Sequence, residues 1–223
     1  RFFKSGDRAE LESGLRNYAG SATGGAQVGP RRFGTAIDAG AALISALNGL
    51  STGALPATPD GFDPNAFAAI LDALGKPLDI AIDILAEALT PPTEDADKIC
   101  DALKFALSES LQNAKDDDNE GTETSLNSSI LNEDLYTETL VNYLAEAVFQ
   151  DIVIEAGTSH EKQQTASILE EREEELRATV TAAVDKHLSP QIDAGISNLS
   201  SDKLRDIQLQ ALRDVFSEWE DLK

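Results

Sequence analysis

The stretch TAIDAGAALISALNGL, residues 35–50, decides the fold class of this chain. It consists mainly of small and apolar residues, and Ile37, Ala41, Ile44 and Leu47 follow one another three or four positions apart. Residues at that spacing lie close to one face of an α-helix, whereas a strand would alternate at every second position. The stretch therefore predicts a helix with a small, apolar surface.

The same three-and-four spacing continues through the rest of the chain. Helices are predicted over about 64–74, 77–89, 94–114, 133–156, 160–187 and 201–221. The first of these begins after a proline-rich break, with Asp63 as its N-cap and Pro64 in its first turn. Runs with strand-like alternation are nearly absent. We therefore predict an all-α, multi-helix assembly with a glycine-rich N-terminal segment and a long acidic loop.

Four parts can be distinguished along the 223 residues. They are a basic, glycine-rich N-terminal segment (1–35), a first helical segment (36–115), an acidic flexible loop (116–132) and a second helical segment (133–223). The second segment holds only three predicted helices, so the sequence is equally consistent with two domains and with one assembly of both segments. At 41% hydrophobic residues, the chain can bury an ordinary core.

Charge is unevenly distributed. The chain has 18 Lys and Arg against 40 Asp and Glu, a net charge of −22, yet residues 1–35 contain six basic and three acidic residues. This segment thus carries +3 and the remainder −25. A strongly negative surface repels nucleic acid and anionic membranes and attracts basic proteins. We expect no direct nucleic-acid partner and no membrane partner.

Cysteine usage and hydropathy indicate the cellular compartment. Cys100 is the only cysteine, so an internal disulfide is impossible, and no stretch resembles a signal sequence or an 18-residue membrane span. We expect a cytoplasmic protein. The sequence begins at Arg1 rather than at Met, so we also expect further residues upstream.

The acidic loop invites a calcium interpretation, which its spacing does not support. Asp116, Asp118, Glu120 and Gly121 occupy the first, third, fifth and sixth places of an EF-hand loop. The twelfth place is Asn127, which cannot supply the bidentate carboxylate that completes the oxygen cage. We expect a hydrated loop without a metal ion.

Other catalytic patterns are also missing. His160 and His187 have no further zinc ligand at a usual spacing, and Cys100 adjoins the apolar stripe of its helix, as expected of a small buried hydrophobe. We predict no metal, no cofactor and no enzymatic activity. An active site assembled from carboxylates distant in sequence stays open as an alternative.

The stretch GSATGGAQVGPRRFG, residues 20–34, has two interpretations. It lacks the preceding strand and the Lys-Ser/Thr of nucleotide-binding loops. Its glycines could simply let two short helices turn sharply, with the arginines in water. Alternatively it recognises a partner, with glycines for close backbone approach beside aromatic and guanidinium anchors. The candidate partner-binding residues are Tyr18, Gly24, Gly25, Gly29, Pro30, Arg31, Arg32 and Phe33.

Several blocks together resemble a known family. LRNYAGSATGGAQVGPRRFGTAIDAGAALISAL, then LAEALTPP, DADKICDAL and LVNYLAEAVFQDIV resemble, in this order, the B component of Qat anti-phage defence systems. The first block is distinctive, and the later ones are general helix patterns that count through their order. The resemblance covers most of the chain and is weakest in the acidic loop and the last helix.

The resemblance implies a non-enzymatic bacterial protein that works with an ATPase, a QueC-like enzyme and a TatD-like nuclease. It implies that the chain binds the QueC-like enzyme, whose relatives make 7-cyano-7-deazaguanine, and is its protein substrate. The family's extreme N-terminus is a short Gly- and Ser-rich tail beginning Met-Gly, where such a modification would be placed. This sequence does not contain that tail, so no modified residue is assigned.

A competing function follows from charge alone. The carboxylate-rich body could mimic DNA and act as a decoy for a basic protein. Binding of that kind weakens steeply with ionic strength, whereas docking through aromatic and apolar anchors depends less on salt.

Overall fold

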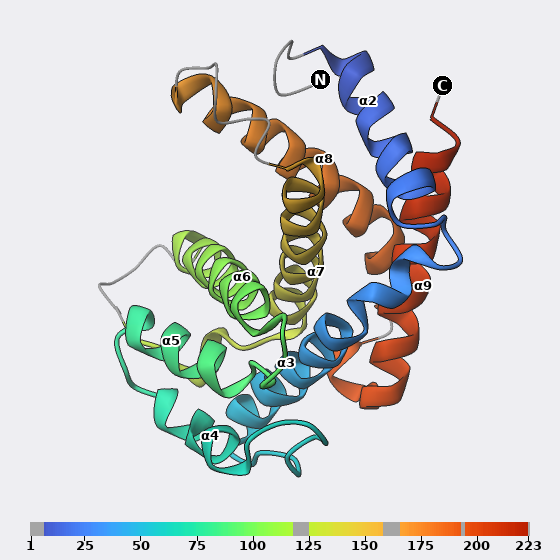
Figure 1. Cartoon of the computed structure of the whole chain (residues 1–223). Coiled ribbons are helices and arrows are strands. Elements are labelled where there is room, and N and C mark those ends of the chain that lie inside the picture. The colour runs from blue at the N-terminus through green and yellow to red at the C-terminus, as the bar shows by residue number, and fades with distance from the viewer. Residues whose placement is uncertain (1–6, 118–124, 158–165, 193–194, 223) are drawn as a thin grey trace.

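The computed structural model describes residues 7–117, 125–157, 166–192 and 195–222, which form an all-α protein (Figure 1). The α-helices in these ranges are α2 (Arg8–Asn17), α3 (Gly34–Thr52), α4 (Pro64–Ala68), α5 (Leu78–Ala88), α6 (Ala96–Asp117), α7 (Glu133–Ala156), α8 (Ala166–Ile192) and α9 (Ser201–Glu220). The predicted fold class, a multi-helix all-α assembly, is confirmed.

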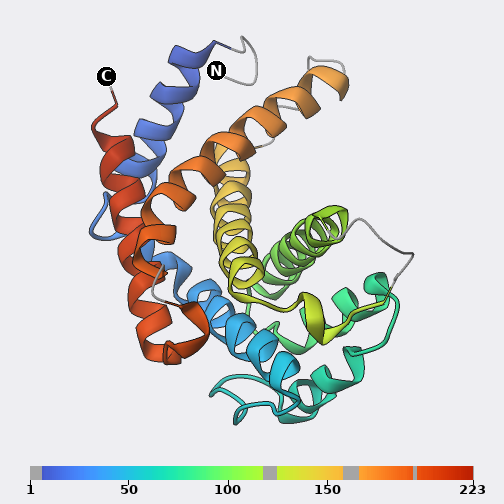
Figure 2. The ribbon, with the colours of Figure 1, turned by 180° about the vertical axis from the view of Figure 1, so that it is seen from behind.

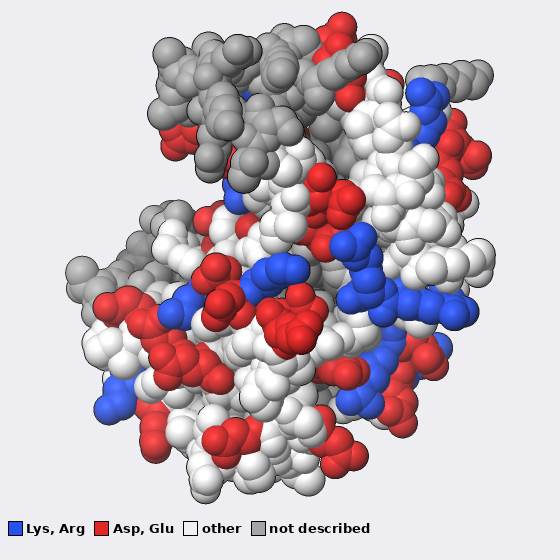
Figure 3. All heavy atoms as spheres, viewed as in Figure 1, with Lys and Arg blue, Asp and Glu red and all other residues white. Residues whose placement is uncertain are grey.

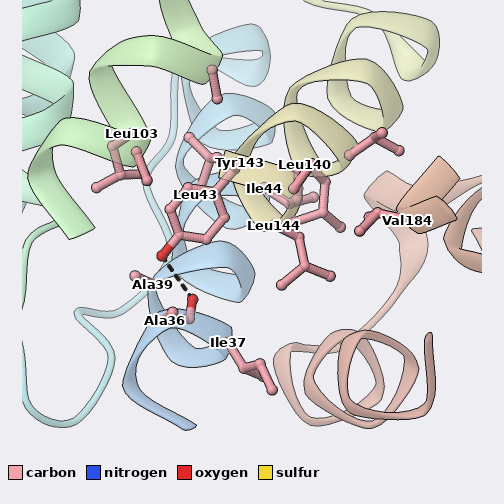
Figure 4. Packing of buried hydrophobic residues seen from close by; sticks show 14 of the residues in the cluster. Ala36, Ile37, Ala39, Leu43, Ile44, Leu103, Leu140, Tyr143, Leu144 and Val184 are labelled. Atoms are coloured by element: carbon pink, nitrogen blue, oxygen red, sulfur yellow. Dashed lines mark hydrogen bonds between the residues drawn. The ribbon is translucent and has the colours of Figure 1, made fainter. Parts of the chain in front are cut away.

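Helix α3 is the predicted apolar helix, and it lies at the centre of the molecule between α7 and α9 (Figure 1). It ends where Gly53 adopts a left-handed backbone with φ of 72°. Its buried face meets leucines of α6 and α7, and the Tyr143 hydroxyl of α7 donates a 2.9 Å hydrogen bond to the Ala36 carbonyl (Figure 4). The small residues let neighbouring helices approach the α3 backbone.

Gly40 lies where α3 closely approaches a side chain of α9. A Cβ at this position would collide with the side-chain oxygen of Gln208, which is buried in α9, and would lie 3.1 Å from the Tyr143 ring. The Gln208 amide nitrogen donates to the carbonyls of Ile37 and Leu204, each at 3.2 Å. Glycine therefore allows a polar link between the two helices within the core.

Helices α6, α7, α8 and α9 each pack against the next one in the chain, and α7 and α9 also pack against α3 (Figure 2). Polar caps fix two of their starts, since the Asn132 side chain accepts from the Leu135 amide and the Ser200 hydroxyl accepts from the Lys203 amide. Helix α7 packs against both α6 and α8, which lie on opposite sides of it. One cluster of buried apolar residues runs from α2 to α9 and includes both predicted helical segments.

The acidic stretch 116–132 is only partly accounted for by the structure. Its first two residues belong to α6, and 118–124, with most of the EF-hand-like positions, lie outside the described residues. The remainder is packed against the body. Leu126 is buried, its amide donates to the Lys76 carbonyl at 2.8 Å, and its carbonyl accepts from the Gly75 amide at 2.9 Å. Ser125 pairs with Pro77 in an antiparallel backbone bridge.

One helical stretch corrects the expectation about membrane-like segments. Within the described ranges, Gly29–Thr52 is long and apolar enough to cross a membrane by length and composition. Its most apolar window is 72% buried inside the molecule, as in the core helix of a globular protein. The same small, apolar residues that would suit a lipid environment here face α7 and α9.

Candidate partner-binding site

The glycine-rich part of the N-terminal segment, residues 18–33, forms a compact unit that we call the head. It consists of a π turn over Tyr18–Ala22, a tight loop and a 3₁₀ turn over Gly29–Phe33, and it joins α2 to α3. It packs against α9 and contacts α7 (Figure 1). All eight predicted partner-binding residues lie in this unit.

Tyr18 fastens the head to α7. Its hydroxyl donates a 2.6 Å hydrogen bond to Oδ2 of Asp151, and its ring is buried, edge-on to the rings of Phe216 and Trp219 in α9. Burial, reinforced by the negative charge of Asp151, raises the pKa of Tyr18 well above its ordinary value. The phenol therefore stays protonated and remains a donor to the carboxylate.

Phe33 and its neighbours pack the other end of the head against α9. The Phe33 ring is buried edge-on to Phe216, with 6.2 Å between the ring centroids, and Pro30 is also buried. Gly29 leaves no room for a side chain, because a Cβ there would lie 2.7 Å from the Phe216 ring. This glycine is required by the close packing of the head on α9.

The loop between the two turns needs glycine for a different reason. Gly24 and Gly25 have φ of 84° and 91°, a left-handed region that other residues rarely adopt. The turn they make brings the Ala26 amide to 3.3 Å from the carboxylate of Glu220, at the end of α9. Both glycines serve the shape of the head.

The outer surface of the head is cationic. Arg32 is exposed and lies 3.1 Å from Oδ1 of Asp151 and 3.9 Å from Glu155. Arg31 is exposed and forms no side-chain ion pair within the described residues. Val28, beside them in the chain, is 56% exposed. Figure 3 shows Lys and Arg side chains gathered over this region, on a molecule that is otherwise rich in carboxylates.

The eight predicted residues divide into two groups. Tyr18, Gly29, Pro30 and Phe33 are buried and shape the head, while Gly24, Gly25, Arg31 and Arg32 reach its surface to different degrees. Sequence reasoning did not find Asp151, to which Tyr18 and Arg32 both bind, because 133 residues separate it from Tyr18. Binding of a partner to these residues stays a prediction.

Other reactive side chains are arranged as structural contacts. His187 Nε2 lies 2.6 Å from the Glu218 carboxylate, which Lys186 also binds at 2.9 Å. The hydrogen bond from Lys186 is the main cause that lowers the pKa of Glu218, and His187 adds to it. Cys100 is a free, half-buried thiol packed against the core, and His160 lies outside the described residues. The described residues include no group of three or more His, Cys, Asp or Glu side chains able to hold a metal ion.

Fold and head together define an acidic protein whose described residues are mainly helical and whose head carries exposed arginines. The model of a protein family described as the Qat anti-phage system associated protein QatB matches residues 24–219, so the chain belongs to the QatB family. It is therefore a component of an anti-phage defence system, with partners inside that system. Comparison with curated proteins found no match, and neither did comparison with solved structures.

Proposed function

We propose that this chain binds a QueC-like enzyme of the same defence system in the cytoplasm and is its protein substrate. The enzyme would act on the N-terminal tail, while the chain itself would perform no catalysis. Family membership supports a partner within the system. The system's ATPase and TatD-like nuclease are further candidate partners.

The observation that carries this proposal is the exposed set Val28, Arg31 and Arg32 on a head that is fixed at both ends. Arginine is enriched among the residues that dominate the binding energy of protein interfaces. Fixing the head in advance lowers the entropy lost on binding. Helix α2 leads into the head and spans ten residues, about 15 Å, so an enzyme that holds the head lies about one helix length from the start of α2.

The first experiment tests the substrate role directly. The full-length protein, with its upstream tail, is co-expressed with the neighbouring QueC-like enzyme, and co-elution and intact mass are measured together. Co-elution with a small mass gain on the N-terminal peptide is the expected result. Co-elution without a mass change would leave the chain as a scaffold. The absence of both co-elution and a mass change would refute the proposal.

A charge reversal tests the head. Arg31→Glu should weaken co-elution with the enzyme, because it replaces an exposed cation that makes no ion pair in the described fold. Lys76→Glu is the matched control, since it changes an exposed cation between α4 and α5 by the same charge. Equal binding of Arg31→Glu and the parent would remove the head from the interface. Equal strengthening of binding in both variants, lost at high salt, would favour the acidic-decoy function instead, because each variant adds negative charge.

A further inference from the structure

A second surface lies away from the head, in an open groove along the first half of α7. It is lined by α6 and α8 on either side and has a volume of about 1010 Å³. Figure 2 shows α6 and α8 on opposite sides of α7, which packs against both. The groove is thus bounded by three helices on a protein built from helices.

The lining of the groove is apolar at its base and acidic at its edges. Phe105, Val141 and Ile192 contribute apolar side chains, and Ala178 and Ala182 on α8 are exposed and small. The acidic residues are Glu109 of α6, Glu133, Asp134 and Glu138 of α7, and Glu174 and Asp185 of α8. Apolar residues flanked by charges are the lining expected where an amphipathic helix docks.

The negative charge of the groove is not neutralised within the described part of the protein. Arg177 is the only basic residue among the described residues of the lining, and its guanidinium lies 2.8 Å from Glu146 and 4.1 Å from the centre of the Phe149 ring. None of the six carboxylates of the groove forms an ion pair with a described residue, although Glu133 accepts from Ser197 and Glu138 from Asn113.

We propose that this groove is a docking site for a basic amphipathic helix of a partner protein. The apolar face of that helix covers Ala178 and Ala182 beside the half-buried Phe105, and its Lys or Arg side chains meet the carboxylates of both walls. Glu174 and Asp185 are eleven residues apart, so the α8 wall spans about three turns, or about 16 Å. A second copy of this chain fits poorly, because its net charge has the same sign. The inference does not rest on the enzyme proposed above.

The test uses the full chain and a fluorescein-labelled peptide helix of about 18 residues with leucine on one face and lysine on the other. Fluorescence anisotropy at physiological salt gives its Kd. Glu174→Lys with Asp185→Lys should raise the Kd at least tenfold. Asp79→Lys with Glu87→Lys changes the net charge equally at exposed positions of α5 and should raise it less than threefold.

A steric variant separates docking from general charge attraction. Ala182→Trp keeps the charge and fills the groove from an exposed position, so it should also raise the Kd at least tenfold, whereas Ala182→Ser should not. A peptide of the same composition in scrambled order should bind at least tenfold more weakly to the parent. Equal effects of the α5 and α8 charge reversals, or full binding by Ala182→Trp, would overturn the proposal.

Discussion

Removing the Tyr18 hydroxyl tests how the head is held on the body. Tyr18→Phe keeps the ring that contacts Phe216 and Trp219 and deletes only the 2.6 Å hydrogen bond to Asp151. The carboxylate of Asp151 is not left alone, because Arg32 still lies 3.1 Å away. The variant therefore isolates one buried hydrogen bond to a charged acceptor.

The expected cost follows from the kind of acceptor. A hydrogen bond to a charged group contributes about 1.5–3 kcal/mol to the free energy of unfolding, and a neutral one about 0.5–1.5 kcal/mol. Tyr143→Phe is the matched control, because its buried hydroxyl donates to the neutral carbonyl of Ala36. In a chain of this size, the loss at Tyr18 corresponds to a fall in Tm of about 3–12 °C.

Urea unfolding of the parent and both variants measures these free energies, and amide exchange locates the change. Exchange of residues 18–33 should accelerate in Tyr18→Phe, while the centre of α3 should stay protected. Were Tyr18→Phe to cost no more than Tyr143→Phe, the head would not depend on a charged hydrogen bond to α7. The head would then not be held in place by this contact.

Further predictions concern pH and close packing. Burial raises the pKa of Tyr18 and Tyr143 above the ordinary value near 10, so the unfolded chain releases these protons first. The free energy of unfolding should then fall above pH 10 by about 1.4 kcal/mol per pH unit for each tyrosine, and a flat urea profile between pH 9 and 11 would contradict this. Gly29→Ala places a Cβ 2.7 Å from a ring of α9 and should cost about 1–3 kcal/mol, measured by thermal unfolding. Gly40→Ala should cost about as much despite the better helix propensity of alanine, and a double-mutant cycle should show the cost removed in a Gln208→Ala background.

Local patterns predicted the helices well where the chain carries both periodicity and a cap. The predicted range 133–156 coincides with the helix that runs from Glu133 to Ala156, because an apolar stripe runs along it, and the structure adds the Asn132 side chain as its cap. Where these signals are weak, the prediction missed structure. Helix α2 was not assigned, and α8 continues through Pro190 to Ile192, since a proline in the final turn removes only one of the last backbone bonds.

The candidate site was predictable in its location but not in its construction. Glycine and arginine content singled out residues 18–33 from the sequence alone. Which of them face inward depends on α7 and α9, whose residues are far away in the chain. Tyr18 and Phe33 have the composition of interface anchors, yet the structure shows their rings filling the space beside Phe216. Composition cannot distinguish an aromatic anchor for a partner from one for the protein's own core.

The head also has a consequence for biosynthesis. The head packs on the C-terminal end of α9, and the contact between Ala26 and Glu220 joins positions 194 residues apart. At a synthesis rate of about 5–20 residues per second, about 10–40 s pass between the synthesis of Ala26 and that of Glu220. A nascent or truncated chain that lacks α9 therefore does not offer a finished cationic surface. The surface is thus completed only when translation of α9 is complete, which restricts its use to whole molecules.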